Sequence, residues 1–406
     1  MNDTMTYDHR SKMNTKHRGK TRMRLWTIIF VTLLAISANC QSDPVDDNKA
    51  YFYVGTYTAH LSPEDSARAG ISLWSVHLDT GALALEKGPW TAVNPSYLSI
   101  AKDRKHLYSV NAVGDYRGTK SGYLTHYAID LESMELTQIS TVSSNGPGPA
   151  YLSVNKSGKH LFLANYGAGN IVAYPIASDG HLGLPTANVQ HIGSSSNPRR
   201  QEAPHPHSII QSPDSRYVFV PDLGLDRIKA YAFDNETGTL EPKPDLDVTT
   251  PSGSGPRHLV FHPSGKFAFC SLEMGNEVVA YRYADGTLTP LASYSTLPED
   301  FQGDSTTAEV RVSPNGKHVY ISNRGHDSIA AFRLDRDTGT LEQIQIISTG
   351  GKTPRNFALD PAGRMLVVGN QQSDNMAGFH VDQDSGKLSP TGTFTTIPAP
   401  TYIRFY

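Results

Sequence analysis

From residue 51 onward, short apolar runs follow one another in a repeated order. Each unit has two apolar runs joined by a turn such as Ser157-Gly158, and then a segment that alternates polar and apolar residues, as in 170–174 and 276–281. A period of two is typical of half-buried strands. A turn with glycine two residues before leucine, as in 180–182, then leads into a fourth segment. The pattern predicts four antiparallel strands per unit, joined by tight turns.

The residue after the start of each first strand can be traced through the whole chain. The spacing between equivalents is 46 to 57 residues, the range expected for propeller blades. Seven equivalents occur, namely Ser96, Ala150, His207, Arg257, Ala308, Arg355 and Thr401. Seven units of four short strands predict an all-β, seven-bladed propeller.

The two ends of the repeat region complete each other. Segments 51–55 and 70–74 look like second and third strands with no first strand before them, and 401–405 looks like a first strand with nothing after it. Joined, they would build one composite blade, which removes two exposed sheet edges. We therefore expect a single propeller over residues 51–406.

The first 40 residues differ from the rest in composition. Seven Lys or Arg residues precede the apolar run 25–38, which is too short for a membrane span and fits a signal peptide. Cys40 directly follows Ser37-Ala38-Asn39, which resembles a bacterial lipobox and predicts lipidation of Cys40. We expect an exported protein, periplasmic or membrane-anchored through Cys40, with residues 41–50 as a polar tether. Simple secretion after cleavage behind Ala38, or a retained anchor, are the alternatives.

Charge and cysteine content exclude several classes. Without residues 1–40 the chain has 29 basic and 37 acidic residues, a net charge of −8, which argues against a nucleic-acid partner. Cys40 and Cys270 are the two cysteines, and no zinc or phosphate-loop motif is present. We expect no cofactor and no metal. His106, His160 and His318, each after a turn lysine, are expected at solvated strand ends.

First strands line the central channel of a propeller, so the seven equivalents should face one another. The ends of the second strands should form a neighbouring ring of Ala112, Tyr166, Leu223, Glu273, Arg324 and Gln371. His207, Arg257, Glu273 and Arg324 would then meet at one mouth, although a single channel arginine is more often a bridge between blades, and Glu273 could simply neutralise Arg257. Two cations beside an acid–base pair indicate an anionic substrate.

A long connection between blades, 197–207, adds further candidates. Loops of this length in compact folds are often functional, and this one could fold over the end of the channel. We expect Arg200 and His205 from this loop, and Arg355 from the channel ring, to contact the substrate. The alternative is a solvent-exposed connection in which His205 has no function.

Three segments carry a resemblance. Residues 255–263 (GPRHLVFHP), 204–208 (PHPHS) and 322–325 (SNRG) resemble the lactonase family of seven-bladed propellers, typified by propeller-type 6-phosphogluconolactonase and related to carboxy-muconate cyclase. The resemblance covers residues 51–406. It implies hydrolysis of a sugar-acid lactone, with His207, Arg257, Glu273 and Arg324 matching the catalytic positions and His205 matching the first histidine of a His-x-His-Ser motif.

For such a reaction, Glu273 or His207 would serve as general base for water. Arg257 and Arg324 would hold the substrate's carboxylate or phosphate and stabilise the developing oxyanion. No G-x-S-x-G motif is present, which favours direct attack by water over an acyl-enzyme. A metal-assisted reaction would have few channel carboxylates, Glu273 and Asp222. Two further hypotheses stay open, a non-catalytic binding propeller and a muconate-type cycloisomerase.

Overall fold

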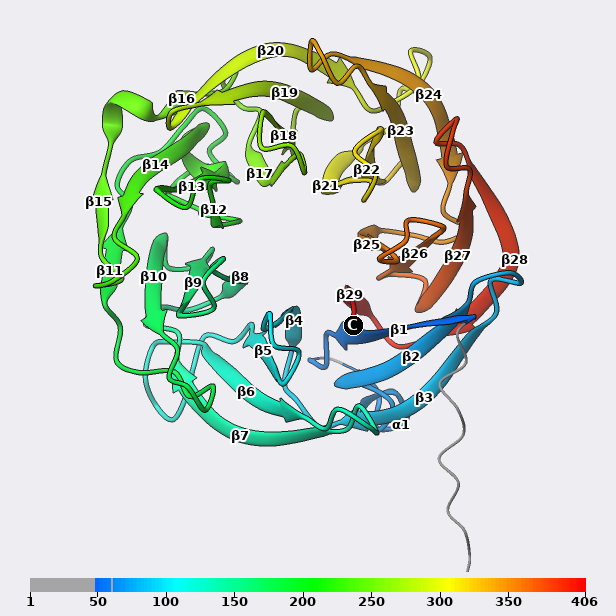
Figure 1. Ribbon diagram of the computed structural model, residues 1–406, viewed down its shortest axis with the longest axis horizontal. Coiled ribbons are helices and arrows are strands. Elements are labelled where there is room, and N and C mark those ends of the chain that lie inside the picture. The colour runs from blue at the N-terminus through cyan, green and yellow to red at the C-terminus, as the bar shows by residue number, and fades with distance from the viewer. Residues whose placement is uncertain (1–47, 60) are drawn as a thin grey trace, which may run out of the picture. The chain divides into compact units, whose positions relative to one another are not determined.

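The computed structural model describes residues 48–59 and 61–406, and these form seven antiparallel sheets arranged around a central axis (Figure 1). The part of the chain that is described contains one short α-helix, α1 (Pro63–Ser66), and two 3₁₀ turns, η1 (Leu223–Leu225) and η2 (Pro244–Leu246). The predicted all-β, seven-bladed propeller is confirmed. The predicted signal peptide and Cys40 lie outside the described residues. Within them, no helix is long and apolar enough to cross a bilayer.

Six blades are each built from consecutive strands, and each blade runs outward from the axis. The innermost strands are β4 (Pro95–Ile100), β8 (Pro149–Val154), β12 (Ile210–Gln211), β17 (Pro256–Phe261), β21 (Thr306–Val312) and β25 (Pro354–Leu359). The second strands are β5 (His106–Asn111), β9 (His160–Asn165), β13 (Tyr217–Asp222), β18 (Phe267–Leu272), β22 (His318–Arg324) and β26 (Met365–Asn370). The third strands are β6 (Tyr123–Ile129), β10 (Asn170–Pro175), β14 (Arg227–Phe233), β19 (Glu277–Ala284), β23 (Ser328–Leu334) and β27 (Asn375–Val381). The outermost strands are β7 (Leu136–Ser143), β11 (Ala187–Gln190), β15 (Leu240–Pro242), β20 (Thr287–Ser295), β24 (Leu341–Ser348) and β28 (Leu388–Thr396).

The seventh blade joins the two ends of the propeller. Its strand order is β29 (Pro400–Phe405), β1 (Lys49–Thr56), β2 (Ile71–His77) and β3 (Leu83–Trp90). Phe52 pairs with Phe405 and Val54 with Ile403, so the C-terminal strand supplies the innermost position (Figure 1). β1 begins at Lys49, inside the segment expected as a tether, because Lys49 still pairs with His77 of β2.

The blade that carries His207 departs from the repeat. Its innermost strand is reduced to Ile210–Gln211, and His207 precedes it, held by a 2.9 Å hydrogen bond from its own amide to the Pro221 carbonyl. Its outer edge is split into β15 and β16 (Val248–Thr249), separated by η2. Prolines at 242 and 244 lack the amide hydrogen that a continuous strand would need. The 197–207 loop comes just before this shortened inner strand.

Most innermost strands contain a β-bulge near their start. The register shifts between Pro95 and Tyr97 in β4, and equivalent shifts occur in β8, β17, β21 and β25. A bulge breaks the strict alternation of side chains. As a result, consecutive residues line the same channel cavity, as Arg257 and His258 do in β17 and as Arg355 and Asn356 do in β25. The channel therefore holds a second ring of side chains that alternation alone would not place there.

Two of the three histidines after turn lysines are buried, contrary to the sequence-based expectation, and the third, His106, is partly buried. His160 is 4% exposed and His318 is 1% exposed, because a glycine turn of the neighbouring blade lies against each ring. A Cβ atom added at Gly386 would come within 2.2 Å of the His318 ring. Tyr320 of the same strand donates a 2.9 Å hydrogen bond to the Gly386 carbonyl. These turns are thus part of the packing between blades.

Replacing Gly386 by alanine is expected to destabilise the propeller more than the same change at Gly158. Both glycines have left-handed backbone, with φ of +74° and +76°, so alanine carries a similar backbone penalty at each. Only Gly386 has a neighbour within 4 Å of the added Cβ. We expect the Gly386→Ala variant to lose about 1–3 kcal/mol more in free energy of unfolding, measured by urea titration. Equal losses would show that the contact with His318 is loose.

Candidate active site at the channel mouth

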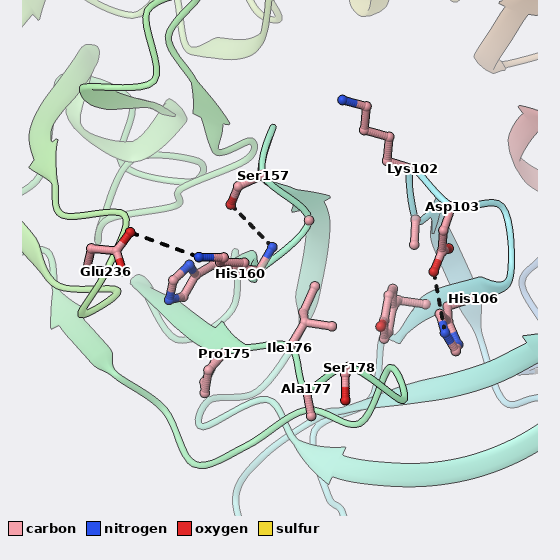
Figure 2. Close-up of a pocket in the computed structure, with 14 residues that line it drawn as sticks. Lys102, Asp103, His106, Ser157, His160, Pro175, Ile176, Ala177, Ser178 and Glu236 are labelled. Carbon is pink, nitrogen blue, oxygen red and sulfur yellow. Dashed lines mark hydrogen bonds and ion pairs between the residues drawn. The ribbon is translucent and has the colours of Figure 1, made fainter.

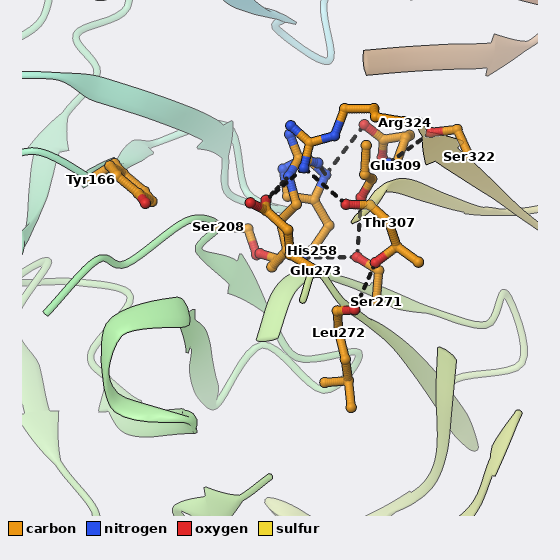
Figure 3. A network of polar contacts seen from close by, with 12 residues as sticks. Tyr166, Ser208, His258, Ser271, Leu272, Glu273, Thr307, Glu309, Ser322 and Arg324 are labelled. Atoms are coloured by element: carbon orange, nitrogen blue, oxygen red, sulfur yellow. Dashed lines mark hydrogen bonds and ion pairs between the residues drawn. The ribbon is translucent and has the colours of Figure 1, made fainter. Parts of the chain in front are cut away.

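Glu273 lies at the centre of a cluster of three arginines, of which Figure 3 labels Arg324. It directly follows β18, where the second strand of its blade reaches the mouth of the channel. Its carboxylate oxygens lie 2.6 Å from Arg200 Nη2, 3.1 Å from Arg257 Nε and 3.0 Å from Arg324 Nη2. The structure thus brings Arg257, Glu273 and Arg324 together, as the ring positions predict, and adds Arg200 from the 197–207 loop.

The electrostatics of the cluster leave Glu273 ionised. Burial would raise the pKa of its carboxyl group, but Arg324, Arg257 and Arg200 outweigh burial and lower that pKa to about 2. Burial, with help from Arg324, lowers the pKa of Arg257 to about 9, so its guanidinium still carries a charge at neutral pH. Three cations against one anion leave an excess of positive charge at the mouth.

His207 lies in the channel beside this cluster. It is 6% exposed, and it lines a small cavity together with Arg257, Arg355 and His258. Burial first, and then the charge of Arg257, holds the pKa of His207 well below its usual value, so the ring is neutral at pH 7. Among the described residues, its Nδ1 atom has no hydrogen-bond partner. His207 is therefore a buried imidazole that can accept a proton.

The 197–207 loop folds over the mouth as expected. Arg200 reaches Glu273 and also lies 3.3 Å from the hydroxyl of Tyr166. The ring of His205 stacks on Tyr166 at 4.4 Å between centroids, and its Nδ1 and Nε2 atoms lie near the Tyr166 carbonyl and the Glu202 carboxylate. His205 consequently forms a wall of the site, and its ring nitrogens already have protein partners.

Asp222, the second carboxylate that the sequence offers to the channel, is engaged elsewhere. Its oxygens accept hydrogen bonds from the amide of His205 and contact Nδ1 of His191, at 2.7 and 2.6 Å. Asp222 thereby anchors the 197–207 loop. The residues that the structure describes contain no group of three or more His, Cys, Asp or Glu side chains placed to hold a metal ion.

Arg324 and Arg355 border the space around the cluster. Arg324 lines a cavity of about 560 Å³ that also includes Asp304, Thr353 and Gln372, and this space is large enough for a sugar. Arg355 lines the small channel cavity with His207, and its guanidinium lies 5.4 Å from the ring of Tyr57. All seven candidate residues of the propeller therefore surround the channel mouth or the cavities next to it.

Several channel residues are not predicted when side chains are assumed to alternate strictly between the two faces of a strand. Glu309 is 2% exposed, and its oxygens lie 3.2 Å from Arg311 Nε, 3.2 Å from His258 Nδ1 and 2.5 Å from Asn356 Nδ2 (Figure 3 shows Glu309 and His258). Nδ1 of His258 also lies 3.2 Å from Arg257 Nη1. Each of these residues occupies or follows a bulge. One feature of the sequence could have indicated them: a carboxylate, Glu309, lies in the middle of an innermost strand, where apolar residues are usual.

Buried histidine makes stability sensitive to acid. Burial, and then Arg257, lowers the pKa of His258 to about 4, whereas histidine in an unfolded chain titrates near 6.5. Between these values the unfolded chain binds the additional proton, so the free energy of unfolding is expected to fall as pH drops from 6.5 to 4. Urea titrations at several pH values would measure the slope. It should be shallower in a His258→Gln variant, and an unchanged slope would show that His258 does not contribute.

A larger cavity, of about 780 Å³, lies away from these residues and is lined by residues of three blades (Figure 2). It is lined by both signs of charge, and the charges contact each other: His106 lies 3.7 Å from Asp103, and Lys159 lies 4.0 Å from Glu236. None of the sequence-predicted site residues lines it. Size alone does not mark the functional site here.

Comparison with known proteins agrees with this geometry. A family model described as lactonase, 7-bladed β-propeller, matches residues 51–405. The 6-phosphogluconolactonase of Bacillus subtilis strain 168 is 34% identical over 309 residues, which cover 75% of this chain and 83% of the relative. The structure of the Pseudomonas aeruginosa periplasmic gluconolactonase is 34% identical with a TM-score of 0.81, covering 88% of this chain and 99% of that chain. A Bacteroides fragilis structure is 31% identical with a TM-score of 0.81, covering 89% and 99%. The chain therefore belongs to the lactonase family of seven-bladed β-propellers.

Proposed function

We propose that the protein hydrolyses a sugar-acid lactone at the mouth of the channel. The observation that carries the proposal is the cluster of Glu273 with three arginines beside the neutral His207. An excess of positive charge suits a lactone that bears an anionic group, and it also suits the oxyanion that forms when water attacks the carbonyl carbon.

His207 is the proposed general base. A neutral imidazole accepts a proton from the attacking water, and the resulting imidazolium later donates a proton to the ring oxygen that leaves. Glu273 is less suited to this role, because three guanidinium groups occupy its carboxylate oxygens, whereas His207 Nδ1 has no partner among the described residues. The proposed role of Glu273 is to hold Arg200, Arg257 and Arg324 in place.

Different arginines are proposed to bind the substrate and to stabilise the oxyanion. Arg257 lines the small channel cavity together with His207, and its proposed role there is to stabilise the oxyanion. Arg324 faces the open cavity and, with Arg355 and Arg200, binds the carboxylate or phosphate of the substrate. His205 and Tyr166 form the wall against which the sugar ring packs.

The names of the relatives support an aldonic acid lactone, with or without a phosphate group. One relative is named a 6-phosphogluconolactonase and a structural neighbour is named a periplasmic gluconolactonase. We propose that this protein is exported, as its N-terminal sequence indicates, with a lipid anchor at Cys40. An exported enzyme meets unphosphorylated lactones, so glucono-1,5-lactone is the proposed substrate class.

Proton release by the full chain tests the activity, because opening a lactone at neutral pH produces a carboxylate and a proton. Glucono-1,5-lactone and its 6-phosphate would be compared above their spontaneous rates in weak buffer. Release on either substrate supports the proposal, and the ratio of the rates shows whether phosphate is required. Binding without release would favour a binding propeller. Proton uptake with an unsaturated diacid, whose lactonisation consumes one proton, would favour a cycloisomerase.

Replacing Arg257 by alanine is expected to lower kcat about a hundredfold, since removal of one preorganised oxyanion donor typically costs about 3 kcal/mol. Arg333→Ala is the matched control, because Arg333 is exposed and pairs with Glu342 on the surface. Steady-state proton release measures both. If the Arg257→Ala variant keeps its rate while the control also does, the arginine only fills the channel.

A further inference from the structure

A second cavity, of about 530 Å³, lies at the other end of the channel from Glu273. Its walls are the later residues of the innermost strands, such as Ser99 and Ser153, whereas the first residues of these strands line the mouth. Tyr97 and Tyr402 line both this cavity and the small cavity that holds His207. We call it the distal cavity.

Closely packed tyrosine rings, tilted against one another, separate the distal cavity from the mouth. The ring centroids of Tyr97 and Tyr402 lie 3.8 Å apart, and Tyr151 lies 4.2 Å from Tyr97. All three tyrosines are at most 7% exposed. A small polar molecule in the distal cavity would therefore contact a floor of aromatic rings and would not reach Glu273.

The charges of the distal cavity are of one sign. Four cationic side chains line it, and no Asp or Glu residue is among its lining residues. They are Lys102, Lys156, Arg311 and Arg404. The larger cavity of Figure 2, which Lys102 also borders, differs in this respect, since its lining includes Asp103 and Glu236, which contact His106 and Lys159.

Most of this positive charge has no protein counter-ion. Within the described part of the chain, Arg404 and Lys102 make no ion pair or side-chain hydrogen bond, and Arg404 Nε is buried without a partner. Lys156 donates to the Pro213 carbonyl and makes no ion pair within the described residues, although the charge of Asp214 acts on it. Arg311 contacts Glu309 through Nε and the Tyr402 hydroxyl through Nη2, yet its side chain stays 24% exposed.

We propose that the distal cavity binds a small polyvalent anion, a phosphate or a polycarboxylate. Like charges gathered in a concave wall create a field that concentrates anions, and guanidinium groups match the oxygens of both ligand classes. Arg404 and Lys102 supply uncompensated charge, and Arg311 is fixed in position by Glu309. This site is independent of the proposed lactone hydrolysis, because the tyrosines close it off from the mouth.

Calorimetric titration of the full chain at low ionic strength tests the site, with inorganic phosphate and citrate as separate probes. The Lys102→Gln, Arg404→Gln double variant is expected to weaken binding of at least one probe about tenfold or more. The Arg324→Gln variant, altered at the mouth, should keep this binding event. Arg333→Gln controls for the general effect of net charge. If the double variant folds poorly, Lys102→Gln alone is used instead, because it changes only an exposed side chain.

The possible results of these titrations either support or overturn the proposed anion site. Loss in the double variant with retention in Arg324→Gln and Arg333→Gln supports an anion site in the distal cavity, and the stronger probe identifies the ligand class. Binding that is unchanged in the double variant and in Lys102→Gln, or equally weakened by Arg333→Gln, overturns the proposal. A wild-type chain that binds neither probe at low ionic strength overturns it as well.

Discussion

Replacing Glu273 by glutamine is expected to lower the free energy of unfolding by about 3–5 kcal/mol, because it leaves buried cations without their anion. The change keeps the shape of the side chain and removes its charge. Arg257 is 2% exposed and has no other carboxylate within ion-pair distance among the described residues, so it cannot recover its partner elsewhere. Urea unfolding at pH 7 would measure the loss.

The matched control for this prediction is Glu342→Gln. Glu342 pairs with Arg333 at 2.9 Å, but both side chains are more than half exposed, and such pairs contribute about 0–1 kcal/mol. A similar small loss in both variants would mean that water or another group compensates the arginines at the mouth. The Glu273→Gln variant should also lose activity, since the arginines that it holds would move apart.

Replacing His207 by glutamine is expected to lower kcat by about 10²–10⁴-fold, the usual contribution of a general base. The ring is buried and neutral, so glutamine fills much of the same space without introducing a charge. Activity of the wild type should also decline on the acid side of the pH profile, below the usual histidine pKa of about 6.5, because burial and Arg257 lower the pKa of His207.

Two comparisons keep this result specific. His181→Gln changes an exposed histidine beside Asp179 and should leave kcat unchanged. Urea unfolding of the His207→Gln variant distinguishes a lost base from a damaged fold. A variant that is folded and retains full kcat would remove His207 from the mechanism and would leave Arg257 and ordered water as the remaining groups.

The sequence predicted the propeller and the mouth because both depend on the repeat. Equivalent positions in seven units must face one axis, so His207, Arg257 and Arg355 could be placed in one channel without coordinates. The ends of the second strands added Glu273 and Arg324 by the same argument. The structure brings these residues together, and their catalytic roles remain predictions for the variants above.

The channel residues and contacts that the repeat did not predict occur where the chain departs from the repeat. Bulges turn His258 and Glu309 into the channel, although strict alternation would face them away. The burial of His318 depends on a turn from the next blade, a contact that no local pattern encodes. Arg200 lies in a loop without periodicity, so its contact with Glu273 required the path of that loop in space.

The composite blade has a consequence for biosynthesis. The hydroxyl of Thr401 in β29 donates to the Gly55 carbonyl in β1 across a separation of 346 residues, so this partner of β1 is synthesised long after β1 itself. Contacts of such long sequence separation form slowly, and until then β1 presents an unpaired edge that other chains could join. A nascent chain of this protein is therefore expected to depend on chaperones until ring closure, and the closed ring then holds both ends of the propeller in one sheet.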